Sequence, residues 1–185
     1  MPKPLLSKAE LDALMGLFES GNPETKGEAG RQRTELKGDV GALKTVFASE
    51  ARRWSRALET QTGHAAKVTL RTIVRASGPV AETGEVCFRL GQKGRRLLIC
   101  SEALVNLVNE KCLGAREEPP MVSHALSEID RALFEACGAF FAEEGTLLSV
   151  ENPPETAARI EARYDIEIAP LLRTTVRLVI DEKDV

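Results

Sequence analysis

The chain has 185 residues, of which 43% are hydrophobic and 29% are charged, and its formal net charge is −3. This balance is typical of a globular protein, and the length predicts one domain with additional segments. The acidic balance gives no case for nucleic-acid binding, which needs a concentrated basic surface. No run of about 18 apolar residues predicts a membrane span. Lys8, Glu10 and Asp12 interrupt the N-terminal segment, so it lacks the apolar core of a secretory signal.

Residues 1–18 have the pattern of a short amphipathic helix. Ser7 and Glu10 have the spacing of a capping box, and Leu6 and Leu11 are placed to form a hydrophobic staple across it. One helix face carries Leu11, Leu14, Met15 and Phe18. A helix of about 12 residues is marginal alone in water. We therefore expect it to fold when a groove covers its apolar face; packing on its own domain is the alternative.

Residues 19–37 are rich in Gly, Pro, Glu, Lys, Thr and Arg, and Leu36 is their one large apolar residue. Such a segment cannot offset its ordering entropy by burial. We expect a flexible linker. A helix that served only the local core would not need this reach, which favours a docking role for residues 1–18.

A folded domain is expected over residues 38–185. Apolar residues at helical spacing predict a helix from about 39 to 61, whose buried face consists of Val40, Leu43, Phe47, Ala51, Trp54 and Leu58. A strand over 68–74 and a hairpin of strands 85–90 and 95–100 follow. Ser101 is placed to cap a second helix that ends at Gly114.

A third helix is predicted to begin at Ser127, which forms a cap with Asp130. Its expected apolar face consists of Ile129, Leu133, Ala136, Cys137, Phe140 and Phe141. The last strand lies over 174–180. Together these elements predict an α/β or α+β sandwich, in which helices pack on an antiparallel or mixed sheet.

Strict alternation over residues 159–168 predicts a strand between the third helix and the last strand. One face carries Ile160, Ala162, Tyr164, Ile166 and Ile168. The other face carries Arg159, Glu161, Arg163, Asp165 and Glu167. We expect this charged face to be solvated; an interface with a neighbouring copy is the alternative.

The sequence offers little for catalysis or metal binding. No phosphate-binding glycine loop, zinc-protease helix or nucleophile elbow is present. His64 and His124 are expected in loops, and Asp130 and Glu135 should point apart on their helix. Four cysteines without a C-x-x-C pair favour buried free thiols in a reducing cytosol over a zinc site: Cys87, Cys100, Cys112 and Cys137. We therefore expect no metal, no cofactor and no enzyme activity.

Three segments resemble the flagellar motor switch protein family FliM. LSKAELDAL at 6–14 resembles the family's N-terminal L-S-Q-x-E-I-D-A-L-L signature. The segment 105–135 is similar to the region where a helix ends in a Gly-rich loop and another helix begins. SVENPPETAARIEARYDIEI at 149–168 looks like the family's N-P-x-x-A stretch and its following strand.

This resemblance implies a middle domain of the CheC-like fold, preceded by a docking peptide for the phosphorylated response regulator CheY. The implied contact residues are Leu6, Ser7, Glu10, Leu11, Asp12, Leu14 and Met15. It also implies a cytoplasmic location at the flagellar basal body. A FliG-like rotor protein and further copies of the chain are the other implied partners.

Three departures from the family pattern bear on these expectations. The loop that in the family contacts FliG is reduced here to Leu113, Gly114, Ala115 and Arg116. Lys8 replaces the usual Gln, which an exposed first turn tolerates. The SpoA-type C-terminal domain, which joins the ring through FliN, is expected to be absent because the sequence stops at Val185.

Two other classes of protein are alternatives, one because it shares the middle-domain fold of this family and the other because it shares its ancestry. A CheC-type phosphatase needs a Glu followed three residues later by an Asn on a helix, but Gly138 follows Glu135 and Val105 follows Glu102 at that spacing. Asn106 is not preceded by a Glu at the required distance either, and the same holds for Asn109. A type III secretion platform subunit is the second alternative, and it has no need of a receiver-docking helix.

Overall fold

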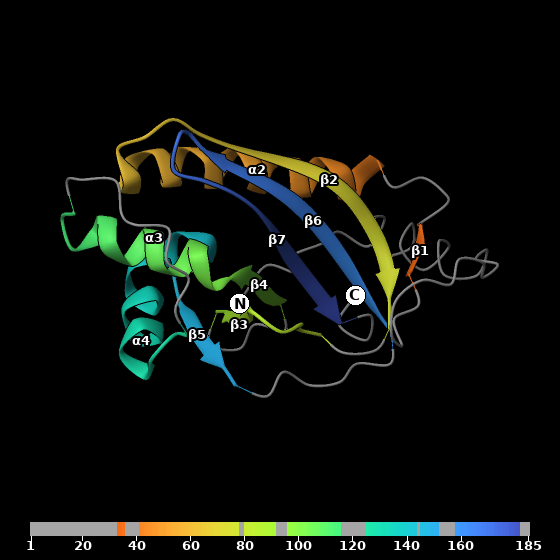
Figure 1. Ribbon diagram of the computed structural model, residues 1–185. Coiled ribbons are helices and arrows are strands. Elements are labelled where there is room, and N and C mark those ends of the chain that lie inside the picture. The colour runs from red at the N-terminus through yellow and green to blue at the C-terminus, as the bar shows by residue number, and fades with distance from the viewer. Residues whose placement is uncertain are drawn as a thin grey trace, which may run out of the picture.

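An antiparallel sheet of seven strands and three α-helices make up the part of the chain that the computed structural model describes, namely residues 33–35, 41–77, 80–91, 96–115, 125–143, 145–151 and 158–181 (Figure 1). The elements are β1 (Arg33–Glu35), α2 (Gly41–Thr62), β2 (Ala66–Ala76), β3 (Glu85–Leu90), β4 (Arg96–Ser101), α3 (Glu102–Cys112), α4 (Glu128–Cys137), the 3₁₀ turn η1 (Ala139–Phe141), β5 (Leu147–Val150), β6 (Arg159–Ile168) and β7 (Leu172–Asp181). The predicted α+β class, with helices on an antiparallel sheet, is confirmed.

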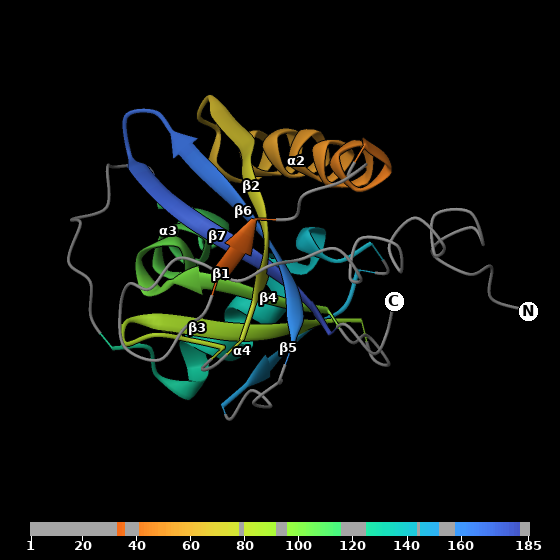
Figure 2. The ribbon, with the colours of Figure 1, turned by 90° about the vertical axis from the view of Figure 1, so that its right-hand side faces the viewer.

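The sheet has an internal two-fold pattern. Its strand order is β1-β2-β6-β7-β4-β3-β5, and Figure 2 shows the long strands β2, β6 and β7 side by side. Exchanging β2, β3 and β4 with β5, β6 and β7 reproduces this order from the opposite edge, if β1 is left aside. One half is therefore α2-β2-β3-β4 and the other is α4-β5-β6-β7. The first strand of each half pairs with the hairpin of the other half, so neither half completes its sheet alone.

Helix α2 covers the sheet with the face that the sequence predicts, apart from Val40, which lies outside the described residues. Its residues Leu43, Phe47, Ala51, Trp54 and Leu58 are all buried, and the helix runs along β2 and β6 (Figure 1). All five predicted inward residues of β6 are buried as well. Full burial of each large apolar side chain contributes about 1.5–3 kcal/mol, so this layer contributes substantially to the stability of the domain.

Trp54 connects α2 to the turn η1 and to strand β6. Its indole Nε1 donates a hydrogen bond to the carbonyl of Phe141 at 3.1 Å. Its ring packs edge-on against Phe141, with centroids 5.2 Å apart, and against Tyr164 of β6 at 4.7 Å. The neighbouring Arg53 donates to the carbonyls of Phe140 and Phe141 at 3.2 and 2.9 Å. These bonds give the turn η1 hydrogen-bond donors that its own short helix lacks.

One charged group of α2 lies inside the core. Glu50 is buried and forms an ion pair with Arg96 of β4, and it accepts a hydrogen bond from the Tyr164 hydroxyl at 3.2 Å. A buried carboxylate is tolerated only when such partners replace water. Burial, and then the Glu50 carboxylate, raise the pKa of Tyr164. The phenol therefore stays protonated and remains a donor to Glu50.

The charged face of β6 is only partly solvated, so our expectation of a wet face is wrong over its first half. Arg159 and Glu161 are completely buried, whereas Asp165 and Glu167 remain accessible. A second apolar cluster covers part of this side of the sheet. It consists of Val80 and of the strand residues Cys87, Leu97, Ile99 and Val179, with Ala81 and Val150 at its margin.

Arg177 of β7 organises this covered side. It donates to Glu161 at 3.2 Å and to the carbonyl of Val80 at 3.0 Å, and it forms an ion pair with Glu85. Arg163 donates to the other Glu161 oxygen at 2.9 Å. The network fastens the segment at 80–85 to the back of the sheet.

Both edges of the sheet have protection. Two side chains of α2 accept hydrogen bonds from backbone amides of β2: Ser55 from Val68 at 2.8 Å and Glu59 from Ala66 at 3.3 Å. They therefore cover the start of this strand. In β5, Glu135 of α4 accepts from the amide of Ser149 at 2.6 Å. Capping of edge amides in this way reduces the tendency of a strand to pair with another chain.

The end of β2 is covered by a strand that lies within the predicted linker. Residues Arg33–Glu35 pair antiparallel with Val74, Arg75 and Ala76. The expectation of a linker through residue 37 is therefore wrong at these three residues. Composition does not reveal this pairing, because the open backbone groups of β2, rather than apolar side chains, recruit the segment.

All four cysteines are free, as expected, but they are not equally buried. Cys87 and Cys100 are buried, whereas Cys112 and Cys137 are half-exposed at the ends of α3 and α4, which corrects our expectation of four buried thiols. Burial raises the pKa of Cys87 to about 12 and also raises that of Cys100. Burial, and then a hydrogen bond with Cys137, raise the pKa of Cys112 to about 12. These three thiols are protonated at neutral pH and are therefore poor nucleophiles.

The buried network on β6 yields a matched test. We expect Glu161→Gln to lower the free energy of unfolding by about 3 kcal/mol, because it leaves the buried Arg177 with less compensating charge. Glu167→Gln, on the same strand, removes an exposed partner of Arg173 and should change it by less than about 1 kcal/mol. Urea denaturation followed by circular dichroism measures both. Equal effects of the two substitutions would contradict this account of the covered face.

Candidate functional site

The predicted docking peptide lies outside the described residues. This applies to the whole segment 1–18 and hence to Leu6, Ser7, Glu10, Leu11, Asp12, Leu14 and Met15. The capping box, the staple and the apolar face of this segment stay predictions. The described part of the predicted site is the end of the second helix.

Helix α3 ends as the sequence predicts. Ser101 caps its start by accepting from the amide of Leu104, and Gly114 follows its last turn with a positive φ of 85°. A side chain is strained in this left-handed conformation, so glycine is the residue that fits. Leu113 and Ala115 on either side are exposed, and Arg116 lies outside the described residues. Three residues of the predicted contact loop therefore lie on the surface.

Asn109 joins this helix end to the start of α4. Its backbone carbonyl accepts from the amide of Leu113 at 3.0 Å, and its side-chain Nδ2 donates to the carbonyl of Asp130 at 2.8 Å. Leu113 and Ile129, which directly precedes Asp130, therefore lie at the same end of the helix pair. We call the surface formed by Leu113, Gly114, Ala115 and Ile129 the α3–α4 corner.

The corner is apolar where surfaces are usually polar. Leu113 is 73% exposed and Ile129 is 78% exposed, and they are the large hydrophobic residues that stand exposed in the described part of the chain. Single exposed apolar residues are common, but two at the same helix junction indicate an interaction surface. Burying both against a partner would remove two large side chains from water, worth about 1.5–3 kcal/mol each.

Ile129 is predicted to lie on the buried face of the third helix, and this prediction is wrong. The fully buried residues of this segment are Phe134 and Phe141. The predicted face is centred on Leu133 and is therefore rotated by about 100° from the buried face, which contains Phe134. Ala136, from the same predicted face, is exposed as well. The helix α4 ends at Cys137, and the chain then tightens into η1.

Gly138 makes the tightening possible. A Cβ atom at this position would lie 2.8 Å from the carbonyl oxygen of Phe134 and 3.0 Å from its ring. Only glycine allows that approach, so this residue sets the phase of the segment after it. The capping box at Ser127 and Asp130 forms as predicted. The prediction of this helix is therefore confirmed at its start and wrong at its end.

The asparagines of α3 are poorly placed for catalysis on a partner. Asn106 is 9% exposed and Asn109 is 4% exposed. A phosphatase that acts on a receiver needs an amide that reaches the partner's phosphoryl group, and these amides are turned into the fold. Glu135 of α4 accepts a hydrogen bond from the amide of Ser149. No group of three His, Cys, Asp or Glu side chains in the described segments is arranged to bind a metal ion.

None of the described helices has the length and apolarity needed to cross a membrane.

No protein-family model and no curated protein matches this sequence. Solved structures do match. FliY from Thermotoga maritima aligns with a TM-score of 0.54 at 14% identity, over 78% of this chain and 88% of that one. A chain of the FliG–FliM complex from H. pylori aligns with a TM-score of 0.60 at 11% identity, over 77% and 92%. The FliM middle domain from Vibrio alginolyticus aligns with a TM-score of 0.52 at 13% identity, over 75% and 92%.

The chain has the fold of the FliM middle domain. This confirms the resemblance at the level of fold, because identities this low carry no more than the fold. The alignments cover 88%, 92% and 92% of the three matched chains.

The exposure of the corner leads to a prediction about stability. We expect Leu113→Ser with Ile129→Ser to change the free energy of unfolding by less than about 0.5 kcal/mol, because neither side chain is buried. Phe134→Ala should lower it by about 3–5 kcal/mol. Thermal or urea unfolding distinguishes the two. A large loss from the double change would mean that the corner contributes to the core and is not an open surface.

Proposed function

We propose that this protein is a non-enzymatic adaptor of the flagellar switch and chemotaxis system, in which the FliM-type body binds a rotor-like protein and the N-terminal segment binds a phosphorylated CheY-like receiver. The observation that carries the proposal is the α3–α4 corner on a FliM-type fold. It exposes Leu113 in the loop where the sequence resemblance implies a FliG contact, and Ile129 in the first turn of the adjoining helix α4. The H. pylori complex that matches this chain contains FliG and FliM, which supports a FliG-like protein as the partner.

The contact is small, and its chemistry follows from its residues. Gly114 has no side chain and Ala115 has only a methyl group, so a partner's backbone can approach closely between Leu113 and Ile129. A partner therefore needs a shallow apolar groove with two pockets. An apolar contact of this kind should depend little on salt, because no charged side chain lies among the residues that define it.

The receiver contact rests on the sequence of residues 1–18. Leu6, Leu11, Leu14 and Met15 would enter a groove of the receiver, with Ser7 and Glu10 organising the first turn. Asp12 is placed to pair with a receiver lysine. Folding on binding uses part of the contact energy, so we expect a dissociation constant on the order of micromolar.

The receiver contact is tested with a peptide of residues 1–20. We expect it to bind a CheY-like receiver more tightly when a phosphoryl mimic is present. Leu11→Ala with Leu14→Ala should remove most of the binding, because each buried leucine contributes about 2 kcal/mol. Fluorescence anisotropy measures the affinities. Lys8→Gln, on the exposed first turn, is the matched control and should leave them unchanged.

A peptide that ignores every phosphorylated receiver would overturn this half of the proposal. That result would favour a secretion-platform subunit.

The rotor contact is tested on the full chain. We expect Leu113→Ser with Ile129→Ser to weaken binding to a FliG-like protein by at least about tenfold, because both apolar side chains leave the interface. Lys111→Ser, next to the corner, is the control and should have little effect. Biolayer interferometry at low and high salt measures both. Retained binding by the double variant would place the rotor contact elsewhere.

A further inference from the structure

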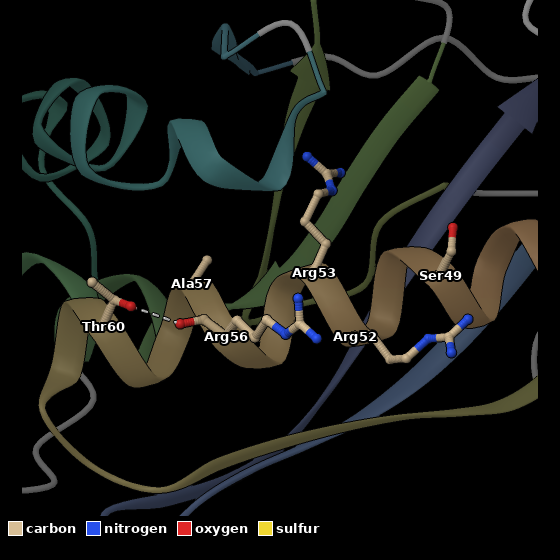
Figure 3. A pocket seen from close by; sticks show the side chains of 6 residues that line it. All are labelled: Ser49, Arg52, Arg53, Arg56, Ala57 and Thr60. Atoms are coloured by element: carbon tan, nitrogen blue, oxygen red, sulfur yellow. Dashed lines mark hydrogen bonds between the residues drawn. The ribbon is translucent and has the colours of Figure 1, made fainter.

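An open hollow runs along the outer side of α2, a helix that contributes no residue to the α3–α4 corner. Its volume is about 610 Å³, and it is lined by Ser49, Arg52, Arg53, Arg56, Ala57 and Thr60. Figure 3 shows Arg53 extending toward the segment that follows α4, whereas Arg52 and Arg56 lie along the helix. The lining covers three turns of helix, or about 16 Å.

No carboxylate among the described residues forms an ion pair with the arginines of this hollow. The side chains of Arg52 and Arg56 are exposed, and neither guanidinium forms an ion pair or hydrogen bond with any residue that the structure describes. Arg53 donates to the carbonyls of Phe140 and Phe141. Carbonyl acceptors fix the orientation of a guanidinium but leave its full charge in place. Three cationic groups therefore line one hollow of a chain whose net charge is −3.

The acidic residues of α2 have other partners. Glu50 is buried and pairs with Arg96, and Glu59 accepts from the amide of Ala66. The arginines at 52 and 56 also stand four residues apart, where like charges disfavour a helix. Folding therefore gains nothing from this pair of charges. The two arginines weaken their own helix and have no carboxylate partner among the described residues. Binding to another protein explains their position better than folding does.

We infer that this hollow, the α2 arginine site, binds an acidic peptide segment of a partner protein. Two guanidiniums one helical turn apart each present a planar fork that donates two parallel hydrogen bonds to a carboxylate. Carboxylates three or four residues apart on a partner helix have the same spacing. The hydroxyls of Ser49 and Thr60 donate to their own helix, to Val46 and Arg56, so the arginines carry the recognition.

A peptide fits this site better than a nucleic acid does. A polyanion gains affinity by neutralising many phosphates along a long basic surface. Here three arginines occupy about 16 Å, and the rest of the chain is acidic and repels a polyanion. A short segment with two or three carboxylates matches both the length and the charge of the hollow.

The test uses the full chain and a fluorescein-labelled helical peptide of about 12 residues, built from alanine with glutamates at i and i+4. We expect binding that weakens as salt rises, because the contact is charged and exposed. Arg52→Gln with Arg56→Gln should weaken it by at least about tenfold, since two charge-assisted contacts are lost. Glutamine retains helix propensity, so the fold should be preserved.

The matched control is Arg71→Gln with Arg89→Gln. Both residues are exposed and lie on strands β2 and β3, and the change also removes two positive charges. It should alter the affinity by less than about twofold if the position of the charge matters. Equal losses in the two double variants would show attraction to net charge only and overturn the site. So would equal binding of a peptide with Gln in place of Glu, or tighter binding of random duplex DNA.

Discussion

Trp54 is the side chain on which the packing of the two halves of this fold depends. It belongs to the first half, yet it bonds to the Phe141 carbonyl and packs on Tyr164, which both belong to the second half. The strands also connect the two halves, because β2 pairs with β6 and β5 pairs with β3. The sheet thus joins the halves through backbone bonds, and the indole joins them through the core. Since each half lacks the partner of its first strand, the domain is expected to fold as one cooperative unit.

The distribution of charge follows from this packing. Residues that face the sheet or its covered back are paired: Glu50 with Arg96, and Arg177 with Glu161 and Glu85. A buried charge without a partner costs several kcal/mol, so folding itself selects these pairs. On the outer side of α2 that cost vanishes, because water solvates each guanidinium. A charged side chain there can remain without a partner in the folded protein and be available to bind another molecule. The arginines of α2 are the clearest example.

The sequence predicts what local patterns determine. The buried face of α2, the hairpin at 85–101, the caps at Ser101 and Ser127, and the inner face of β6 all follow from periodicity and capping, and the structure confirms them. Nonlocal packing determines the rest. Strand β1 depends on an open edge elsewhere in the chain, and the burial of Glu161 depends on a loop that folds over the back of the sheet. No residue pattern within either segment carries that information.

The candidate site shows the same division. The loop at 113–115 follows from a resemblance, and its exposed position agrees with that expectation. The exposure of Ile129 does not follow from the sequence, because the apolar residues of this helix fit two faces about 100° apart. One face contains Ile129 and Leu133, the other contains Phe134 and Phe141, and the core buries the second. The contact between Gly138 and Phe134 is a signal only once the backbone is known, because a helix can also contain a glycine without breaking there.

The two contacts of the proposed adaptor differ in how much order they require. The α3–α4 corner is fixed before any partner arrives, because Asn109 bonds to both helices and Ser127 and Gly114 complete their ends. Binding there loses little conformational entropy, so a modest apolar area suffices for a lasting contact. The segment at 1–18, if it folds only on its receiver, has to order about 12 residues each time it binds. That cost keeps its affinity low and its dissociation fast, and a small change in the receiver, such as one phosphoryl group, then alters occupancy strongly. A rigid corner suits attachment and a folding peptide suits response, and a switch adaptor needs both on one chain.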